Sequence, residues 1–189
     1  MTVKTELSIQ DDLELVTGVF ERLSADLGMI LDRQLALEDI RAERASRRVA
    51  GEGRVHISFK LALQSGQRQR QGCLLVPLPD AIALAAYLMM VPDEVVARER
   101  ERSELDRPMK EALLEVGNFV AGACDAVLRR LYPDEVTVRS EGCQGVRAGI
   151  RPALVYQEGE ELIVGRARAR IHEFEPCELI LTLPQIADL

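Results

Sequence analysis

The segment 110–131 holds the residues of this chain whose types and spacing best suit chemistry. Positions three or four apart share one face of a helix, and here they are Glu111, Glu115, Asn118, Gly122, Asp125 and Arg129. A glutamate can act as a general base or pair with a cation, whereas an asparagine amide does not titrate and instead holds water through one donor and one acceptor. No histidine, nucleophile elbow or set of metal ligands lies nearby. We therefore expect a half-site that a partner protein completes.

The same segment contains residues that weaken a helix. Gly117 and Gly122 each cost about 1 kcal/mol relative to alanine, and Asn118 is also a poor helix former. Residues that weaken a helix without an evident gain in packing indicate a functional role. We therefore expect this face of the helix to be a surface that another protein approaches closely. A merely solvated polar face is the alternative. The opposite side is expected to face the core through Leu113, Val116, Val120, Cys124 and Val127.

Composition and charge exclude several classes of function. The 189 residues fit one domain, spanning 1–189, and the 24 Lys and Arg against 31 Asp and Glu give a net charge of −7. Nucleic-acid binding needs clustered positive charge and base-stacking aromatics, whereas this chain is acidic and has no Trp. We expect no nucleic-acid partner.

Histidine, cysteine and apolar patterns exclude further classes. Two histidines and four widely spaced cysteines form no zinc or CxxC motif, so we expect no metal site. No apolar run reaches the roughly 20 residues of a membrane span, and the N-terminus lacks a signal-peptide pattern. We expect a cytoplasmic protein with reduced thiols.

The first half of the chain predicts one long helix and then a hairpin. Residues 11–45 are predicted to form an amphipathic helix, with 38–54 as its frayed end and a loop. Its apolar stripe is Leu13, Val16, Phe20, Leu23, Leu27 and Ile30, widened by Leu15, Val19 and Leu31. We expect this helix to pack on its own core, with a coiled-coil seam as the alternative. Residues 55–77 alternate as a hairpin that exposes His56 and Ser58.

The second half predicts two more helices and several strands. A short helix over 80–91 is apolar all round and therefore buried, the charged segment 93–107 is a solvated helix or linker, and the helix over 104–131 has Pro108 in its first turn. In the region 135–183, strands are expected at 135–140, 146–157, 161–174 and 178–183, with a turn at Glu158-Gly159. Arg166, Arg168 and Arg170 share one strand face, either solvated or a patch for an anion or acidic partner.

These elements predict a single α+β domain. Successive strands joined by hairpin turns favour an antiparallel sheet, and its two long helices are expected to cover one face.

The sequence 109–122, MKEALLEVGNFVAG, resembles the signature helix of the CheC/CheX/FliY chemotaxis phosphatases, which carries Glu and Asn three residues apart. The preceding hairpin, the helix that starts at Pro79-Asp80 and the linker also resemble that family. The likeness thus covers most of the chain beyond about residue 55. Glu111 stands where the family usually has Ser or Asp. The single intact motif is most similar to the CheX type.

The resemblance implies a phosphatase that acts on the phospho-aspartate of a CheY-like receiver protein. Asn118 would orient the attacking water and Glu115 would pair with the receiver's lysine, while Glu111, Gly117, Phe119 and Gly122 would contact the receiver. The chain would need no cofactor of its own, because Mg²⁺ would come with the receiver, and it would pair as a homodimer. A noncatalytic receiver-binding or scaffolding module with the same fold is the alternative.

Overall fold

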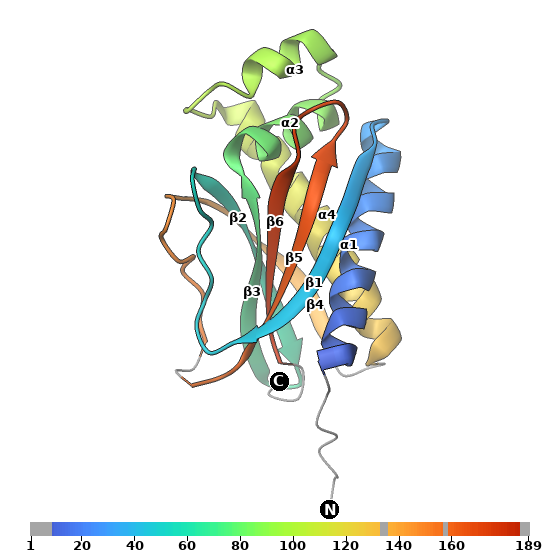
Figure 1. Ribbon diagram of the computed structural model, residues 1–189, viewed down its shortest axis with the longest axis vertical. Helices are drawn as coiled ribbons and strands as arrows, with labels where there is room; N and C mark the ends of the chain where they lie inside the picture. The colour runs from blue at the N-terminus through green and yellow to red at the C-terminus, as the bar shows by residue number, and fades with distance from the viewer. Residues whose placement is uncertain (1–8, 133–135, 157–158, 186–189) are drawn as a thin grey trace, which may run out of the picture.

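An antiparallel six-stranded sheet carries two long helices on one of its faces, as the sequence predicts (Figure 1). This computed structural model describes residues 9–132, 136–156 and 159–185. The strand order is β1-β5-β6-β3-β2-β4. The helices are α1 (Ile9–Leu31), α2 (Leu78–Leu88), α3 (Asp93–Glu99) and α4 (Arg107–Leu131). The strands are β1 (Leu35–Ala45), β2 (His56–Ser65), β3 (Arg68–Pro77), β4 (Thr137–Val146), β5 (Leu162–Ile171) and β6 (Cys177–Pro184).

Helix α1 packs on the chain's own core, against β1, β5 and α4. Its buried apolar residues are Leu15, Val16, Val19, Phe20, Leu23, Leu27 and Leu31. All of them belong to the predicted stripe, of which only Leu13, half-buried, and Ile30, 48% exposed, are not fully buried. A Cβ on Gly165 would lie 2.5 Å from Cγ1 of Val16, so this glycine lets α1 sit close on β5. The apolar face is therefore used within the chain, which favours core packing over a coiled coil.

The prediction of a helix as far as residue 45 is wrong, because α1 ends at Leu31 and β1 follows. Asp32 adopts a positive φ of 50° and ends the helix. The chain then turns back as β1, which pairs antiparallel with β5. Strand β1 is an edge strand with many charged residues, and its register shifts between Glu38 and Arg41. That shift interrupts the two-residue alternation from which a strand is recognised in sequence.

The predicted hairpin forms as β2 and β3, but the prediction that it exposes His56 and Ser58 is wrong. His56 is only 4% exposed, and its Nδ1 lies 2.9 Å from the carbonyl oxygen of Arg54. Gly51 packs directly on the imidazole ring, where a Cβ would clash. This burial lowers the pKa of His56.

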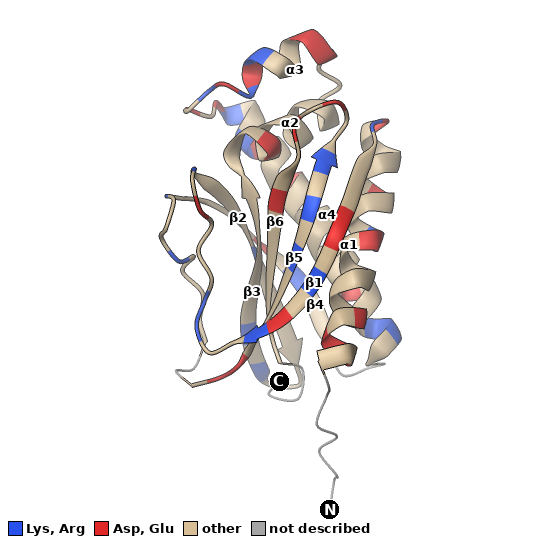
Figure 2. Ribbon diagram, viewed as in Figure 1, with Lys and Arg blue, Asp and Glu red and all other residues tan. Residues whose placement is uncertain are grey.

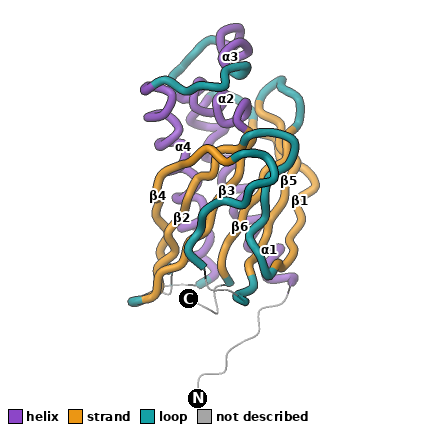
Figure 3. The backbone as a smooth tube through the Cα atoms, turned by 90° about the vertical axis from the view of Figure 1, so that its left-hand side faces the viewer, coloured by secondary structure: helices purple, strands orange, loops and turns teal. Residues whose placement is uncertain are grey.

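The sheet face opposite α1 and α4, on which His56 and Ser58 lie, is partly buried by two loops, 46–54 and 147–156. They cross the face opposite α1 and α4 (Figure 3), and the amide of Gly149 donates to the carbonyl of Gly51 at 2.8 Å. They cover a small second core of Cys73, Leu75, Leu154, Val164 and Ile180. The strand predicted at 146–157 is therefore wrong over 147–156, which is irregular. The predicted turn at Glu158-Gly159 lies partly outside the described residues, because Glu158 is not among them.

Helix α3 occupies part of the segment predicted as a solvated helix or linker, and a buried ion pair fastens its end to α2. Asp80, in the first turn of α2, is 2% exposed, and Arg100 Nη2 lies 2.7 Å from its Oδ1. The Arg100 guanidinium also stacks over Phe174 at 3.8 Å from the ring centroid. Helix α4 begins shortly afterwards, where the side chain of Asp106 accepts from the amide of Met109 at 2.9 Å. The Asp80–Arg100 ion pair and the stacking on Phe174 thus fix the position of the segment that leads into α4.

Candidate functional site

Helix α4 presents its chemistry-bearing side to solvent and its apolar side to β4, α1 and α2. The five residues predicted to face the core, Leu113, Val116, Val120, Cys124 and Val127, are all buried. On the opposite side the exposed residues include Glu111, Leu114, Glu115, Asn118 and Gly122. Periodicity thus predicted which side of this helix is buried and which is exposed.

The amide and carboxylate singled out from the sequence are in contact. Asn118 Nδ2 donates to Oε2 of Glu115 at 3.1 Å, one helical turn away. Neighbouring acidic residues are paired with arginines: Glu111 with Arg107 at 2.8 Å, and Asp125 with Arg129 at 2.6 Å. Within the part of the chain that the structure describes, no lysine or arginine pairs with Glu115. The charge of Glu115 is therefore available to a cation from outside.

The sequence-based explanation of Gly117 needs correction. Gly117 is buried, and a Cβ there would lie 3.2 Å from Ser140 Oγ on β4 and 3.4 Å from Cδ1 of Phe59. The glycine therefore has a packing reason, the close approach of α4 to the sheet. Phe119 is half-buried and packs against the main core. Of the four residues expected to contact a partner, Glu111 and Gly122 are exposed, and Gly117 and Phe119 serve packing within the chain.

Gly122 differs from Gly117 because nothing lies within 4 Å of where its Cβ would be. Replacing Gly122 by alanine is expected to raise the free energy of unfolding by about 1 kcal/mol, the helix-propensity difference. Chemical denaturation checks this gain. If Gly122 is kept small so that a partner can approach, the same variant binds that partner less tightly although it is more stable. Gain of stability with unchanged affinity would remove Gly122 from the partner surface.

Leu114 is an exposed apolar residue beside the candidate pair, and sequence reasoning did not single it out. Its side chain is 45% exposed on the polar side of α4, one turn before Asn118. Its Cδ2 would lie 3.8 Å from a Cβ on Gly142, a β4 residue with φ of 91°. A single exposed leucine is ordinary on a protein surface, so Leu114 is a candidate contact only because it lies beside the polar pair. The sequence signal was the position of Leu114 on the side opposite the buried stripe.

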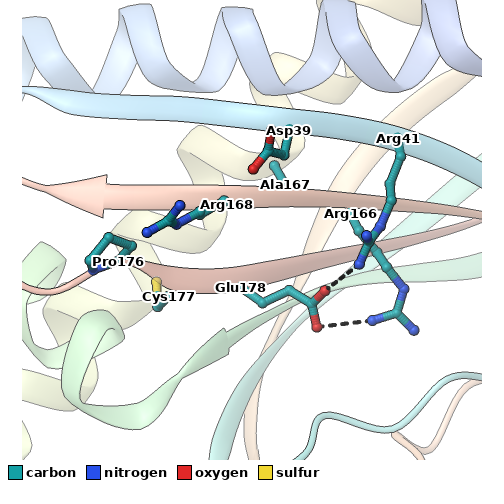
Figure 4. A pocket seen from close by; sticks show the side chains of 8 residues that line it. All are labelled: Asp39, Arg41, Arg166, Ala167, Arg168, Pro176, Cys177 and Glu178. Carbon is teal, nitrogen blue, oxygen red and sulfur yellow. Dashed lines mark hydrogen bonds and ion pairs between the residues drawn. The ribbon is translucent and has the colours of Figure 1, made fainter.

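The arginines of β5 lie on the other face of the sheet from α4. Blue and red residues lie side by side on β1, β5 and β6 in Figure 2. Glu178 is held by both Arg41, at 3.1 Å, and Arg166, at 2.9 Å, in a shallow cavity of about 350 Å³ (Figure 4). Arg166 also pairs with Glu43 at 3.2 Å. Arg166 is thus neutralised within the chain, whereas Arg168 and Arg170 are exposed and form no ion pair with the described residues, so both interpretations of this strand face stay open.

The described residues hold neither a cluster of metal ligands nor a helix that could span a membrane. No group of three or more His, Cys, Asp or Glu side chains in this part of the chain could hold a metal ion. No helix in the described ranges is both long enough and apolar enough to cross a bilayer. The four cysteines in those ranges are free thiols, and burial raises the pKa of Cys73 and of Cys124 to about 12.

The arrangement of sheet and helices matches the fold of solved CheC/CheX/FliY chemotaxis proteins. FliY from Thermotoga maritima superposes with a TM-score of 0.70 at 15% identity, over 99% of this chain and 95% of FliY. The chemotaxis protein CheX from Desulfovibrio desulfuricans gives 0.58 at 12%, over 89% and 97%. A structure of the FliG-FliM complex from H. pylori gives 0.62 at 12%, over 95% and 96%. No family model and no curated protein sequence matches the chain.

Proposed function

We propose that this chain is a phosphatase that hydrolyses the phospho-aspartate of a CheY-like receiver protein. The observation that carries the proposal is the exposed, hydrogen-bonded pair of Asn118 and Glu115 on α4. The resemblance of residues 109–122 to the phosphatase signature helix and the shared fold support it.

The proposed chemistry is positioning rather than covalent catalysis. Asn118 would enter the receiver's active site, where its amide holds a water molecule in line with the phosphorus atom. The water attacks, the bond between phosphorus and the aspartate oxygen breaks, and inorganic phosphate and a free carboxylate result. Mg²⁺ would be bound by the receiver's own acidic residues and would stabilise charge on the phosphoryl oxygens.

Docking would use the face of α4 around this pair. Glu115 is positioned to meet the receiver's lysine, because its charge has no basic partner among the described residues. Leu114 would supply an apolar contact next to it.

A homodimer and a cytoplasmic location remain part of the proposal, and the mass measured by light scattering checks the dimer.

Charge reversal at Glu115 tests the docking step. Glu115→Lys is expected to weaken receiver binding about tenfold or more, because a lysine would face the receiver's lysine. Isothermal titration calorimetry measures the affinity. Glu52→Lys is the matched control, because Glu52 is exposed in the loop 46–54, on the sheet face opposite α4. Unchanged affinity in Glu115→Lys would remove Glu115 from the interface.

A second candidate function is a noncatalytic receiver-binding or scaffolding module. It is favoured by the likeness to the FliM middle domain, because one of the similar solved structures is a complex of FliM with FliG. A scaffold has no need of an amide at position 118, whereas a phosphatase does.

The experiment that separates the two is a dephosphorylation time course. Each phosphorylated receiver of the source organism is incubated with the chain at a tenth of the receiver concentration. A phosphatase shortens the phospho-aspartate lifetime through multiple turnovers, whereas a scaffold binds the receiver and leaves that lifetime unchanged.

A further inference from the structure

The hydrogen bond between Glu115 and Asn118 fixes which end of the amide faces outward. A carboxylate only accepts hydrogen bonds, so the group of Asn118 that lies 3.1 Å from Glu115 Oε2 must be the NH₂. The carbonyl oxygen of the amide is therefore turned away from Glu115. A water molecule that donates a proton toward the site needs such an acceptor.

The same carboxylate retains capacity for a second partner. It bonds Asn118 through Oε2, and a carboxylate has about four acceptor positions on its two oxygens. A cation that approaches Glu115 from solvent can thus bind while the bond to Asn118 persists. Excluding water on docking strengthens both interactions.

We propose that Glu115 is the positioning residue of this site: it holds the Asn118 amide with its carbonyl outward and couples that orientation to the arrival of the partner's cation. This inference rests on the proposed function but adds a role to Glu115 beyond pairing with the receiver. Both side chains are exposed on the surface of α4, so the bond contributes little to the stability of the fold. The effect of the bond is on the orientation of the Asn118 amide.

Two substitutions at Glu115 separate the two roles. Glu115→Gln keeps the side-chain length and an oxygen that accepts from Asn118 but removes the charge, whereas Glu115→Ala removes both. We expect KM for the phosphorylated receiver to rise about tenfold in both variants, because both lose the ion pair. We expect kcat to fall about tenfold in Glu115→Ala but to stay within about twofold of the wild-type value in Glu115→Gln. Equal kcat values in the two variants would overturn the proposal.

A readout without catalysis keeps this inference distinct from the proposed function. The three-bond couplings and the side-chain amide order parameter of Asn118 are measured by NMR on the free protein. We expect one dominant Asn118 rotamer in the wild type and in Glu115→Gln, and rotamer averaging in Glu115→Ala. Glu111→Gln is the control, because Glu111 bonds Arg107 instead and should leave Asn118 unaffected.

The two failures are distinguishable. If the wild type never accelerates dephosphorylation, the proposed function fails while the NMR result still decides whether Glu115 orients the amide. If Asn118 stays ordered in Glu115→Ala, the positioning role is overturned whatever the activity.

Discussion

Replacing Asn118 by alanine is expected to lower the accelerated rate of receiver dephosphorylation about 100-fold, toward the receiver's own rate. Alanine cannot hold the attacking water, and no other amide in the described part of α4 is available to replace Asn118. The side chain is exposed, and alanine is a better helix former than asparagine, so the fold should be as stable or slightly more stable. Phosphate release under single-turnover conditions measures the loss.

Two controls make this result specific to the amide. Asn118→Asp keeps the shape but replaces the donor that faces Glu115 with a carboxylate, so it should also be inactive. Circular dichroism and receiver affinity should match the wild type in Asn118→Ala. A variant that binds the receiver normally and still accelerates dephosphorylation at the wild-type rate would exclude the proposed role of Asn118.

Removing Arg100 is expected to lower the free energy of unfolding by about 3 kcal/mol. Its partner Asp80 is 2% exposed, so Arg100→Ala leaves a carboxylate in the interior without its counter-charge at 2.7 Å. The stacking of Arg100 on Phe174 is lost as well. Urea denaturation monitored by circular dichroism measures the change.

The pH dependence of this effect follows from the direction of the Asp80 shift. Burial raises the pKa of Asp80, and the Arg100 charge partly opposes that rise. The folded state therefore binds the proton more tightly than the unfolded state, so protonation of Asp80 favours folding. In Arg100→Ala the opposing charge is gone, and the stability deficit relative to wild type should shrink as the pH falls from about 7 toward about 5.

A second substitution tests the cause directly. Asp80→Asn in the Arg100→Ala background removes the buried charge and should recover a large part of the lost stability. A double variant no more stable than Arg100→Ala would show that lost packing, and not the unpaired carboxylate, dominates.

The elements that sequence predicted well are those whose pattern is local. Helix α4 buries one regular set of apolar residues, and β2 sends every second residue from Ile57 to Leu63 into the main core, so periodicity located both. The spacing of Glu115 and Asn118 likewise placed them on one exposed face, where the structure shows them hydrogen-bonded. The role of this pair in catalysis stays a prediction.

The failures depend on contacts between distant segments. His56 reads as a polar-face residue until the loop carrying Gly51 covers it. Strand β1 is charged because it is an edge, and its irregular register conceals the alternation. Gly117 and Gly122 look equivalent in sequence, but only Gly117 faces Ser140 on β4, which lies more than twenty positions later in the chain.

The central claim is that the α4 face accelerates hydrolysis of a receiver phospho-aspartate through Asn118. The most direct measurement is the initial rate of phosphate release from a phosphorylated receiver, with the wild type and Asn118→Ala compared at the same substoichiometric concentration. We predict a rate proportional to wild-type concentration and no acceleration with Asn118→Ala. Phosphate release that is equal with wild type, with the variant and with neither, for every phosphorylated receiver of the source organism, would contradict the claim.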